Sequence, residues 1–424
     1  MAKRDPDWRK KQLQKRLYIL LGAVIAVLAV ILLIVNIVNR RSGGSASSAT
    51  AAEGPLGEIT EDVVLSTAQP AEAGSAAATA GTENNAVENA AAASAAAGAT
   101  TDAAATGAAA GATTDAAAST AAGTTAPAGP VKLTVTATGD VTIGIDDSFD
   151  YDTSFNGTYY DVEDPEWFFE NLADIFKADD LTIINFEGVL SEQGEREDKQ
   201  YAFRGDPIFA KVLTGVDAAN LANNHSFDYG RDAYEDTKQI LADAGITTFG
   251  YDRSMVIDVN GIKVGLTGTL ALYDEWDAKD GMVEQIEWVK QQGAQLVISS
   301  VHWGDEGEYH QADWQEYLGH AAVDAGADLV IGHHPHRLQP YETYKGKHIL
   351  YSLGNFCFGG HRSPSDMDCA VWQETFTFEN GVLTGDDYNI IPCSISSASD
   401  YNNYQPTPLE GDVAERALGK IPEL

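Results

Sequence analysis

Polar side chains that can bind metal ions follow several separate apolar stretches of this sequence. These stretches are typical of β-strands because they are short, rich in β-branched residues and bounded by turn residues. The residues at their ends are Asp140, Asn185, Glu187, Asn223, Asn224, His225, His302, His333, His334, His336 and Asn355. Imidazole and carboxylate groups are ligands for Zn, Mn and Fe. The pattern therefore predicts a site for one or two divalent ions, and a two-metal site can activate water and hold a tetrahedral phosphorus.

Each of these residues also has a structural explanation. An Asp that follows Gly at a strand end, such as Asp140, is usually a turn residue, and Asn223 and Asn224 could form Asx turns. Glu187 and His302 could be core residues whose polar atoms have hydrogen-bond partners. Their recurrence at one strand end after another favours a shared site, because ligand sites of α/β folds lie beyond the carboxyl ends of strands. The remaining histidines are expected in loops or on the surface: His310, His320, His348 and His361.

Predicted strands and helices alternate along residues 131–424, and these elements must position the polar side chains. A strand is predicted over 131–139, a helix over 163–178, and another helix over 230–244, which ends near a glycine. Asn260-Gly261 is the typical turn of a β-hairpin. Repeated strand–helix units followed by hairpins predict an α/β fold in layers, as a sandwich rather than a barrel.

The N-terminus has the pattern of a membrane anchor. Residues 1–16 form a tail with seven basic residues, and residues 17–38 are 22 uncharged, mostly apolar residues. A helix of that length spans about 33 Å, enough to cross the hydrocarbon core. The basic tail predicts a cytoplasmic N-terminus and an extracellular C-terminal domain. A cleaved signal peptide is the alternative, but its apolar region would usually be about 7–15 residues long.

Residues 39–130 are predicted to be a disordered linker. From residue 42 the segment has no Lys, Arg or aromatic residue, Ala fills 34 of 89 positions, and AGATTDAAA occurs at both 97–105 and 110–118. Without an apolar stripe to bury, such a composition does not favour a packed structure.

The charge of the chain excludes some partners. Its formal net charge is −36, of which −34 belongs to residues 131–424. Such a domain is a poor nucleic-acid binder, because phosphate contacts need a basic surface. Three cysteines cannot form a disulfide scaffold. Cys357 and Cys369 could form a single bond, or Cys357 could be a buried free thiol.

Six sequence blocks resemble those of the capsule-synthesis CapA family, in the family's order. They are ATGDV (137–141), NFEGVLS (185–191), FRGDP (203–207), LANNHSFDYG (221–230), VHWG (301–304) and the long block 327–358. The resemblance implies an αββα sandwich related to calcineurin-like metallophosphatases. It also implies a role in poly-gamma-glutamate capsule synthesis or export.

The resemblance implies metal ligands at Asp140, Glu187, Asn224, His302, His334 and His336. Glu187 stands where a bridging carboxylate would be, and His225 resembles the acid that protonates the leaving group. The chain departs from the metallophosphatase pattern at Thr142, where a histidine is usual, and at Glu187, where an aspartate is usual. Fewer than two tightly held ions per chain are therefore expected.

Three functions are compatible with these observations. The first is a membrane-anchored, extracytoplasmic protein of poly-gamma-glutamate capsule biosynthesis, working with other capsule-synthesis membrane proteins. The second is a metal-dependent phosphoesterase that acts on a phosphate ester of the cell envelope. The third is a binding module for an anionic polymer, without catalysis.

The basic tail and apolar segment predict a testable topology. Protease added to intact cells should digest residues 42–424 and spare the tail before Leu17, because only the tail would be cytoplasmic. Protection of the C-terminal domain in intact cells, with digestion after lysis, would contradict this orientation.

Overall fold

The computed structural model describes residues 129–251, 253–273 and 275–424. The predicted tail, the predicted transmembrane helix and all but the last two residues of the predicted linker lie outside this part. Within the described part, no helix is both long and apolar enough to cross a membrane.

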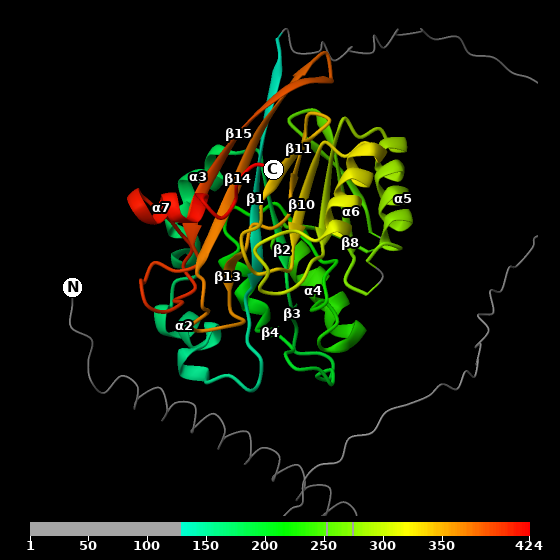
Figure 1. The fold of residues 1–424 in the computed structure, drawn as a ribbon. Helices are drawn as coiled ribbons and strands as arrows, with labels where there is room; N and C mark the ends of the chain where they lie inside the picture. The colour runs from blue at the N-terminus through cyan, green and yellow to red at the C-terminus, as the bar shows by residue number, and fades with distance from the viewer. Residues whose placement is uncertain (1–128, 252, 274) are drawn as a thin grey trace, which may run out of the picture. The chain divides into compact units, whose positions relative to one another are not determined.

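Two large β-sheets form the centre of the fold (Figure 1). The strands of the first sheet, in spatial order, are β16 (Thr407–Pro408), β15 (Val382–Ser394), β14 (Asp368–Glu379), β1 (Val131–Thr142), β2 (Leu181–Phe186), β5 (Ala218–Asn220) and β6 (Thr247–Phe249), with β13 (Asn355–Phe358) also paired to β1. The strands of the second sheet are β11 (Tyr341–Tyr344), β12 (Lys347–Leu350), β10 (Leu329–His333), β9 (Leu296–His302), β8 (Ile262–Leu270) and β7 (Met255–Val259). A small pair consists of β3 (Val189–Leu190) and β4 (Arg204–Gly205).

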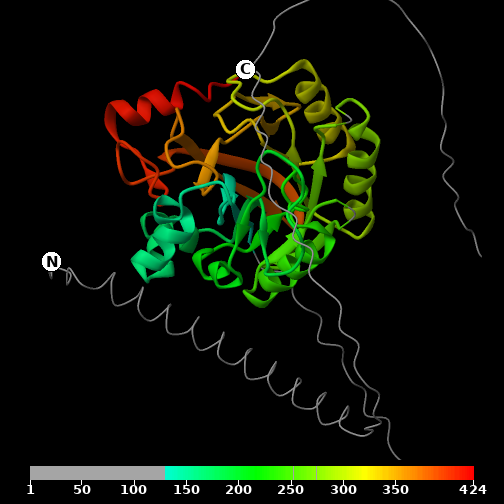
Figure 2. The same ribbon diagram turned by 90° about the horizontal axis from the view of Figure 1, so that it is seen from below.

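Helices cover the outer faces of the two sheets (Figures 1 and 2). The first sheet is covered by α2 (Phe155–Val162), η2 (Pro165–Leu172), α3 (Ala173–Ala178), η3 (Pro207–Val212) and α4 (Gly230–Asp243). The second is covered by α5 (Ala278–Gln291) and α6 (Asp313–Ala325). Two short elements remain, η1 (Tyr151–Thr153) and α7 (Gly411–Leu418).

Three large apolar clusters among the described residues hold these layers together. One lies between the sheets and joins Leu133 and Val135 of β1 to Ile298 of β9 and Leu329 of β10. The other two lie between each sheet and its helices. The layers therefore follow the order helix, sheet, sheet, helix, which agrees with the predicted α/β sandwich. Burial of apolar surface from both sides makes the central strands nearly continuous apolar sequences.

Local sequence signals predicted most elements well. The Asn260-Gly261 hairpin forms between β7 and β8, with both residues at positive φ as a type I′ turn requires. The helix predicted over 163–178 is wrong in detail. Glu163 adopts a left-handed conformation, and a 3₁₀ segment from Pro165 precedes a single short α-helix.

One expectation about a single residue needs correction. His348 was expected in a loop or on the surface, yet it is buried in β12, where its Nδ1 lies 3.1 Å from Oε1 of the buried Glu374. Of the two alternatives for Cys357, the structure shows the buried free thiol, and all three cysteines are buried and free. Cys369 lies opposite Cys393 in the β14–β15 ladder.

Candidate metal centre

The first sheet places a row of polar side chains at one edge of the molecule. Asp140 of β1 lies opposite Asn185 of β2 and Asn355 of β13, and Asn185 lies opposite Asn220 of β5. These strands are parallel, so their carboxyl ends meet at the same edge. The pairing of β1 with β2 shifts register just before Asp140, and such bulges often re-aim a side chain near a functional site.

Strand β1 changes its pairing partner at Gly139, and the lack of a side chain there makes the change possible. A Cβ on Gly139 would lie 2.0 Å from the carbonyl oxygen of Gly354, which also accepts a hydrogen bond from the amide of Asp140. Before Gly139, β1 pairs with β14, and after it β1 pairs with β13. Only glycine fits this close approach, which places the Asp140 carboxylate beside the second sheet.

The second sheet contributes histidines to the same edge. His302 of β9 lies opposite His333 of β10, and both are buried. Nδ1 of His333 lies 3.1 Å from Oδ1 of Asp140, and the amide of His334 donates to Oδ2 of Asp140 at 3.1 Å. Nδ1 of His336 lies 3.2 Å from the same Oδ2. Asp140 therefore joins the carboxyl ends of the two sheets.

Asn185 connects the carboxylates to the histidine of β9. Its amide nitrogen lies 2.9 Å from Oδ1 of Asp140, 3.1 Å from Oε1 of Glu187 and 3.3 Å from Nδ1 of His302. Nε2 of His302 lies 2.8 Å from Oδ1 of Asn224. All six predicted ligand residues are thus gathered at one edge, although they are spread over almost 200 positions of the sequence.

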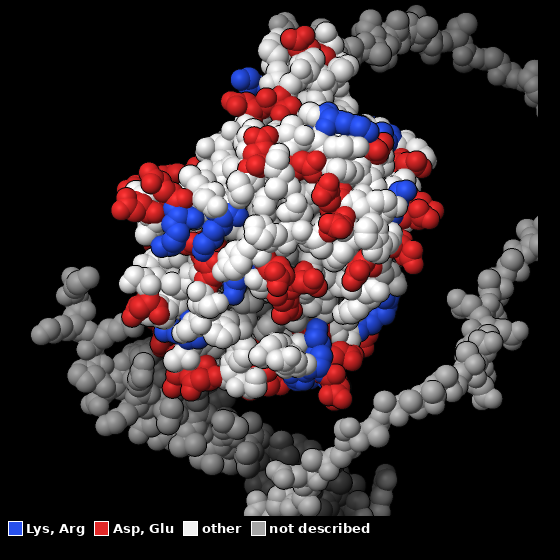
Figure 3. All heavy atoms as spheres, viewed as in Figure 1, with Lys and Arg blue, Asp and Glu red and all other residues white. Residues whose placement is uncertain are grey.

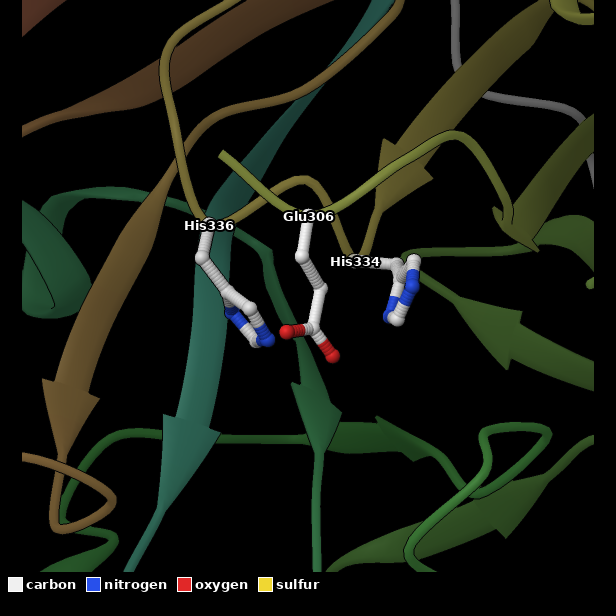
Figure 4. Close-up of side chains that lie close together, drawn as sticks. All are labelled: Glu306, His334 and His336. Atoms are coloured by element: carbon white, nitrogen blue, oxygen red, sulfur yellow. The ribbon is translucent and has the colours of Figure 1, made fainter. Parts of the chain in front are cut away.

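Ligand atoms in this region come together in two sets of three. Asp140, Glu187 and His302 each offer one atom within 4.8 Å of the others, and so do Glu306, His334 and His336. Figure 4 shows the second set, with the Glu306 carboxylate between the two imidazole rings. Asn224 reaches the first set through its contact with His302.

The ionisable groups of the cluster perturb one another strongly. Burial alone would raise the pKa of Asp140, but hydrogen bonds from His333 and His336 outweigh burial and hold that pKa well below its usual range. Burial, reinforced by the charge of Asp140, raises the pKa of Glu187 well above its usual range. Burial and the neighbouring His336 lower the pKa of His334 to about 3.

His225 is held by a buried carboxylate beside the cluster. Its Nδ1 donates to Oδ2 of Asp228 at 2.8 Å, and Lys199 Nζ donates to Oδ1 of Asp228 at 2.6 Å and to the carbonyl of Asn224 at 2.8 Å. The bond to Asp228 fixes the tautomer and leaves Nε2 available. Burial lowers the pKa of His225, so the ring is neutral over more of the pH range.

A cavity of about 500 Å³ opens next to these groups. Its lining includes His225, Glu306, His336, Arg337 and His361. His361, which was expected in a loop or on the surface, also lines the cavity. The cavity gives a ligand access to the histidines from solvent, while Asp140 and Glu187 lie behind them, fully buried.

Sequence reasoning missed Glu306 and gave His333 no definite role. Glu306 lies in an acidic loop beyond β9, beside Asp305 and Glu308, and no periodicity distinguishes the three. Lys199 lies far from any strand end and was also missed. The only available signal for Glu306 was that its loop follows a strand that ends in a histidine.

The family assignment follows from comparison with known proteins. The model of the family described as bacterial capsule synthesis protein PGA_cap matches residues 134–360. The chain belongs to this family. The matched segment contains all six predicted ligands and His225, so the residues at the edge of the sheets fall within the shared part of PGA_cap proteins. The predicted resemblance to CapA proteins is confirmed.

Two curated relatives support the same assignment. The chain is 32% identical over 257 residues to the capsule biosynthesis protein CapA of Bacillus anthracis, covering 54% of this chain and 60% of that protein. It is 32% identical over 214 residues to the PGA biosynthesis protein CapA of Bacillus subtilis strain 168, covering 45% and 56%. The chain thus spans less than two thirds of the length of either relative.

Asn185 should make a measurable contribution to the stability of the cluster. Replacing Asn185 with Ala removes the buried amide that serves Asp140 and Glu187, and should lower the free energy of unfolding by about 1–3 kcal/mol. Asn171→Ala is the matched control, because Asn171 is exposed and its side chain bonds, among the described residues, only to Thr407. The effect of this control on the free energy of unfolding should stay within about 0.5 kcal/mol. Urea unfolding in the presence of a chelator measures the free energy of unfolding of both variants. Equal stability of the two variants would show that Asn185 is not needed there.

Proposed function

We propose that this chain is a membrane-anchored, extracytoplasmic protein of poly-gamma-glutamate capsule biosynthesis or export. Membership of the PGA_cap family and the CapA relatives support the capsule role. The apolar segment 17–38 and the basic tail before it support the anchor and its orientation. We also propose that the domain is of the metallophosphatase type and that its strand-end cluster holds divalent metal.

Unsatisfied buried atoms are the observation that carries the metal proposal. Oε2 of Glu187, Nε2 of His333 and Nδ1 of His334 have no hydrogen-bond partner, although all three side chains are buried. Leaving such an atom unpaired costs about 1–3 kcal/mol. Glu187 and His334 each belong to one of the two ligand sets, so a bound cation would satisfy their atoms; His333 lies outside both sets.

The negative charge of the cluster also supports a bound cation. Asp140, Glu187 and Glu306 converge there, and among the described residues no Lys or Arg forms an ion pair with any of them. The ion-pair partners of Asp140 and Glu187 among the described residues are histidines. A divalent cation bound by Asp140, Glu187, Asn224, His302, His334 and His336 would offset the negative charge.

The residues fit Mn, Zn or Fe better than Mg or Ca. Three or more imidazoles with carboxylates form a donor set of intermediate hardness, whereas Mg and Ca prefer oxygen alone. A metal held there would supply Lewis-acid activation of water and would neutralise charge on an anionic substrate. Asn185 would hold the carboxylates in place, and the cavity would admit the substrate.

The metal proposal is tested by metal uptake. Purified protein titrated with Mn²⁺ or Zn²⁺ should retain metal after dialysis, and His336→Ala and His334→Ala should each retain less, because each removes a ligand. His310→Ala should bind as the wild type does, since His310 is exposed and lies outside both ligand sets. Elemental analysis with thermal melts separates lost metal from lost folding. A wild type that takes up neither ion would leave only a metal-free binding module.

The capsule proposal is tested genetically. Cells that lack the gene should carry less surface poly-gamma-glutamate, and the wild-type gene should restore it. If the metal is needed, Asp140→Asn should fail to restore the polymer while His310→Ala succeeds, with equal protein levels shown by immunoblot. Unchanged polymer in the deleted cells would contradict a role in capsule biosynthesis.

A second candidate is hydrolysis of a phosphate ester, and the His225–Asp228 pair favours it. Nδ1 of His225 is bonded to Asp228, so Nε2 must first take up a proton. The imidazolium formed, held beside the Asp228 carboxylate, would then protonate a leaving group in the cavity.

If this is correct, His225→Ala should keep its metal and lose about 10²–10⁴-fold in the rate of hydrolysis of a generic phosphodiester. His310→Ala should keep both its metal and the wild-type rate of hydrolysis. Absence of hydrolysis in the metal-loaded wild type, or full activity of His225→Ala, would exclude His225 as the acid.

A further inference from the structure

We propose that Glu306 is a metal ligand, and that it forms with His334 and His336 a second, cavity-facing position for a divalent cation. The first position would use Asp140, Glu187 and His302. This inference rests on the proposal that the cluster binds metal, and it adds a ligand from outside the predicted set. Mn²⁺ and Zn²⁺ are the ions whose ligand preferences the set fits.

The geometry of Glu306, His334 and His336 is that of an open three-ligand site. Each residue offers one ligand atom within 4.8 Å of the other two. In Figure 4 the carboxylate of Glu306 lies between the imidazole rings. Two histidines and a glutamate are a known ligand set for catalytic zinc, which keeps a further position open for water or substrate. Here the open side would face the cavity, since Glu306 and His336 both line it.

A buried ring nitrogen of His334 that lacks a hydrogen-bond partner also supports a cation beside Glu306. His334 is only 7% exposed, and its Nδ1 has no hydrogen-bond partner. Glu306 is exposed, and its carboxylate forms no hydrogen bond or ion pair with any described residue. Glu306 and His334 belong to the same set of ligand atoms.

The loop that carries Glu306 is fastened to the segment that carries the histidines. The amide of Gly307 donates to the carbonyl of Pro335 at 2.8 Å, and the amide of Trp303 donates to the carbonyl of His333 at 3.0 Å. The side-chain amide of Gln339, which is fully buried, donates to the carbonyls of Glu308 and His310. These bonds fix the backbone on both sides of Glu306, so its approach to the histidines is built into the fold.

The backbone that carries His334 and His336 is strained, and this strained conformation places both rings beside Glu306. His334 has φ 97° and His336 has φ 54°, in the left-handed region that residues with a side chain seldom adopt. Such conformations cost on the order of 1–3 kcal/mol each and persist where the surroundings enforce them. The bond from the amide of His334 to Asp140 is one such restraint. The result is that both rings face Glu306, from either side of Pro335.

Metal stoichiometry tests this role of Glu306 directly. Full-length protein in detergent, stripped with a chelator, is titrated with Mn²⁺ or Zn²⁺ by calorimetry, and bound metal is counted by elemental analysis. The wild type should bind two ions, more than the sequence pattern predicts, because Glu306 adds a ligand that the pattern does not include. Glu306→Gln, which keeps the shape and removes the charge, should bind one, or bind the second at least about tenfold more weakly. Glu308→Gln is the matched control, because Glu308 is exposed in the same loop and lies outside the ligand set.

The outcomes separate this inference from the proposed function. Loss of one ion in Glu306→Gln, with normal binding in Glu308→Gln and unchanged melting of the metal-free proteins, supports the second position. Identical stoichiometry and affinity in Glu306→Gln and wild type would overturn it, while loss of metal in His336→Ala would leave the proposed metal centre standing. A wild type that binds no metal would overturn both.

Discussion

The contacts of one buried carboxylate, Asp140, hold the functional edge of this protein together. Asp140 lies where β1 leaves β14 and pairs with β13, and its oxygens meet Asn185 from its own sheet and His333, His334 and His336 from the other. A buried carboxylate is costly without donors, so the two sheets must bring their carboxyl ends to the same place. The candidate metal centre therefore depends on contacts from both sheets that meet at this residue.

The charge of the domain sets the second constraint. Figure 3 shows acidic side chains spread over the face seen there, with Lys and Arg in small groups. A surface with a formal charge of −34 over residues 131–424 repels polyanions at low salt. Contact with an acidic polymer would thus be easier at the cavity, where bound cations and Arg337 would offset the carboxylates.

Much of the site could be predicted from sequence, because strand ends are local features. Asp140, Glu187 and His302 each follow a short β-branched run, and parallel strands place such ends together. Glu306 could not be predicted in this way, since its position depends on a loop held by Gln339 and Pro335 across the chain. The helix expected over 163–178 is divided instead: a 3₁₀ segment, in which Phe168 and Phe169 are buried, precedes the short α3. Intrinsic propensity does not predict such a division, because tertiary packing can override it.

Anomalous diffraction from crystals of the domain grown with Mn²⁺ or Zn²⁺ tests the metal centre most directly. A strong peak is expected that is bounded by Asp140, Glu187 and His302, with ligand distances of about 2.0–2.3 Å. Crystals in which these side chains adopt the same arrangement, but in which no anomalous peak lies among them at saturating metal, would contradict a metal centre at this edge.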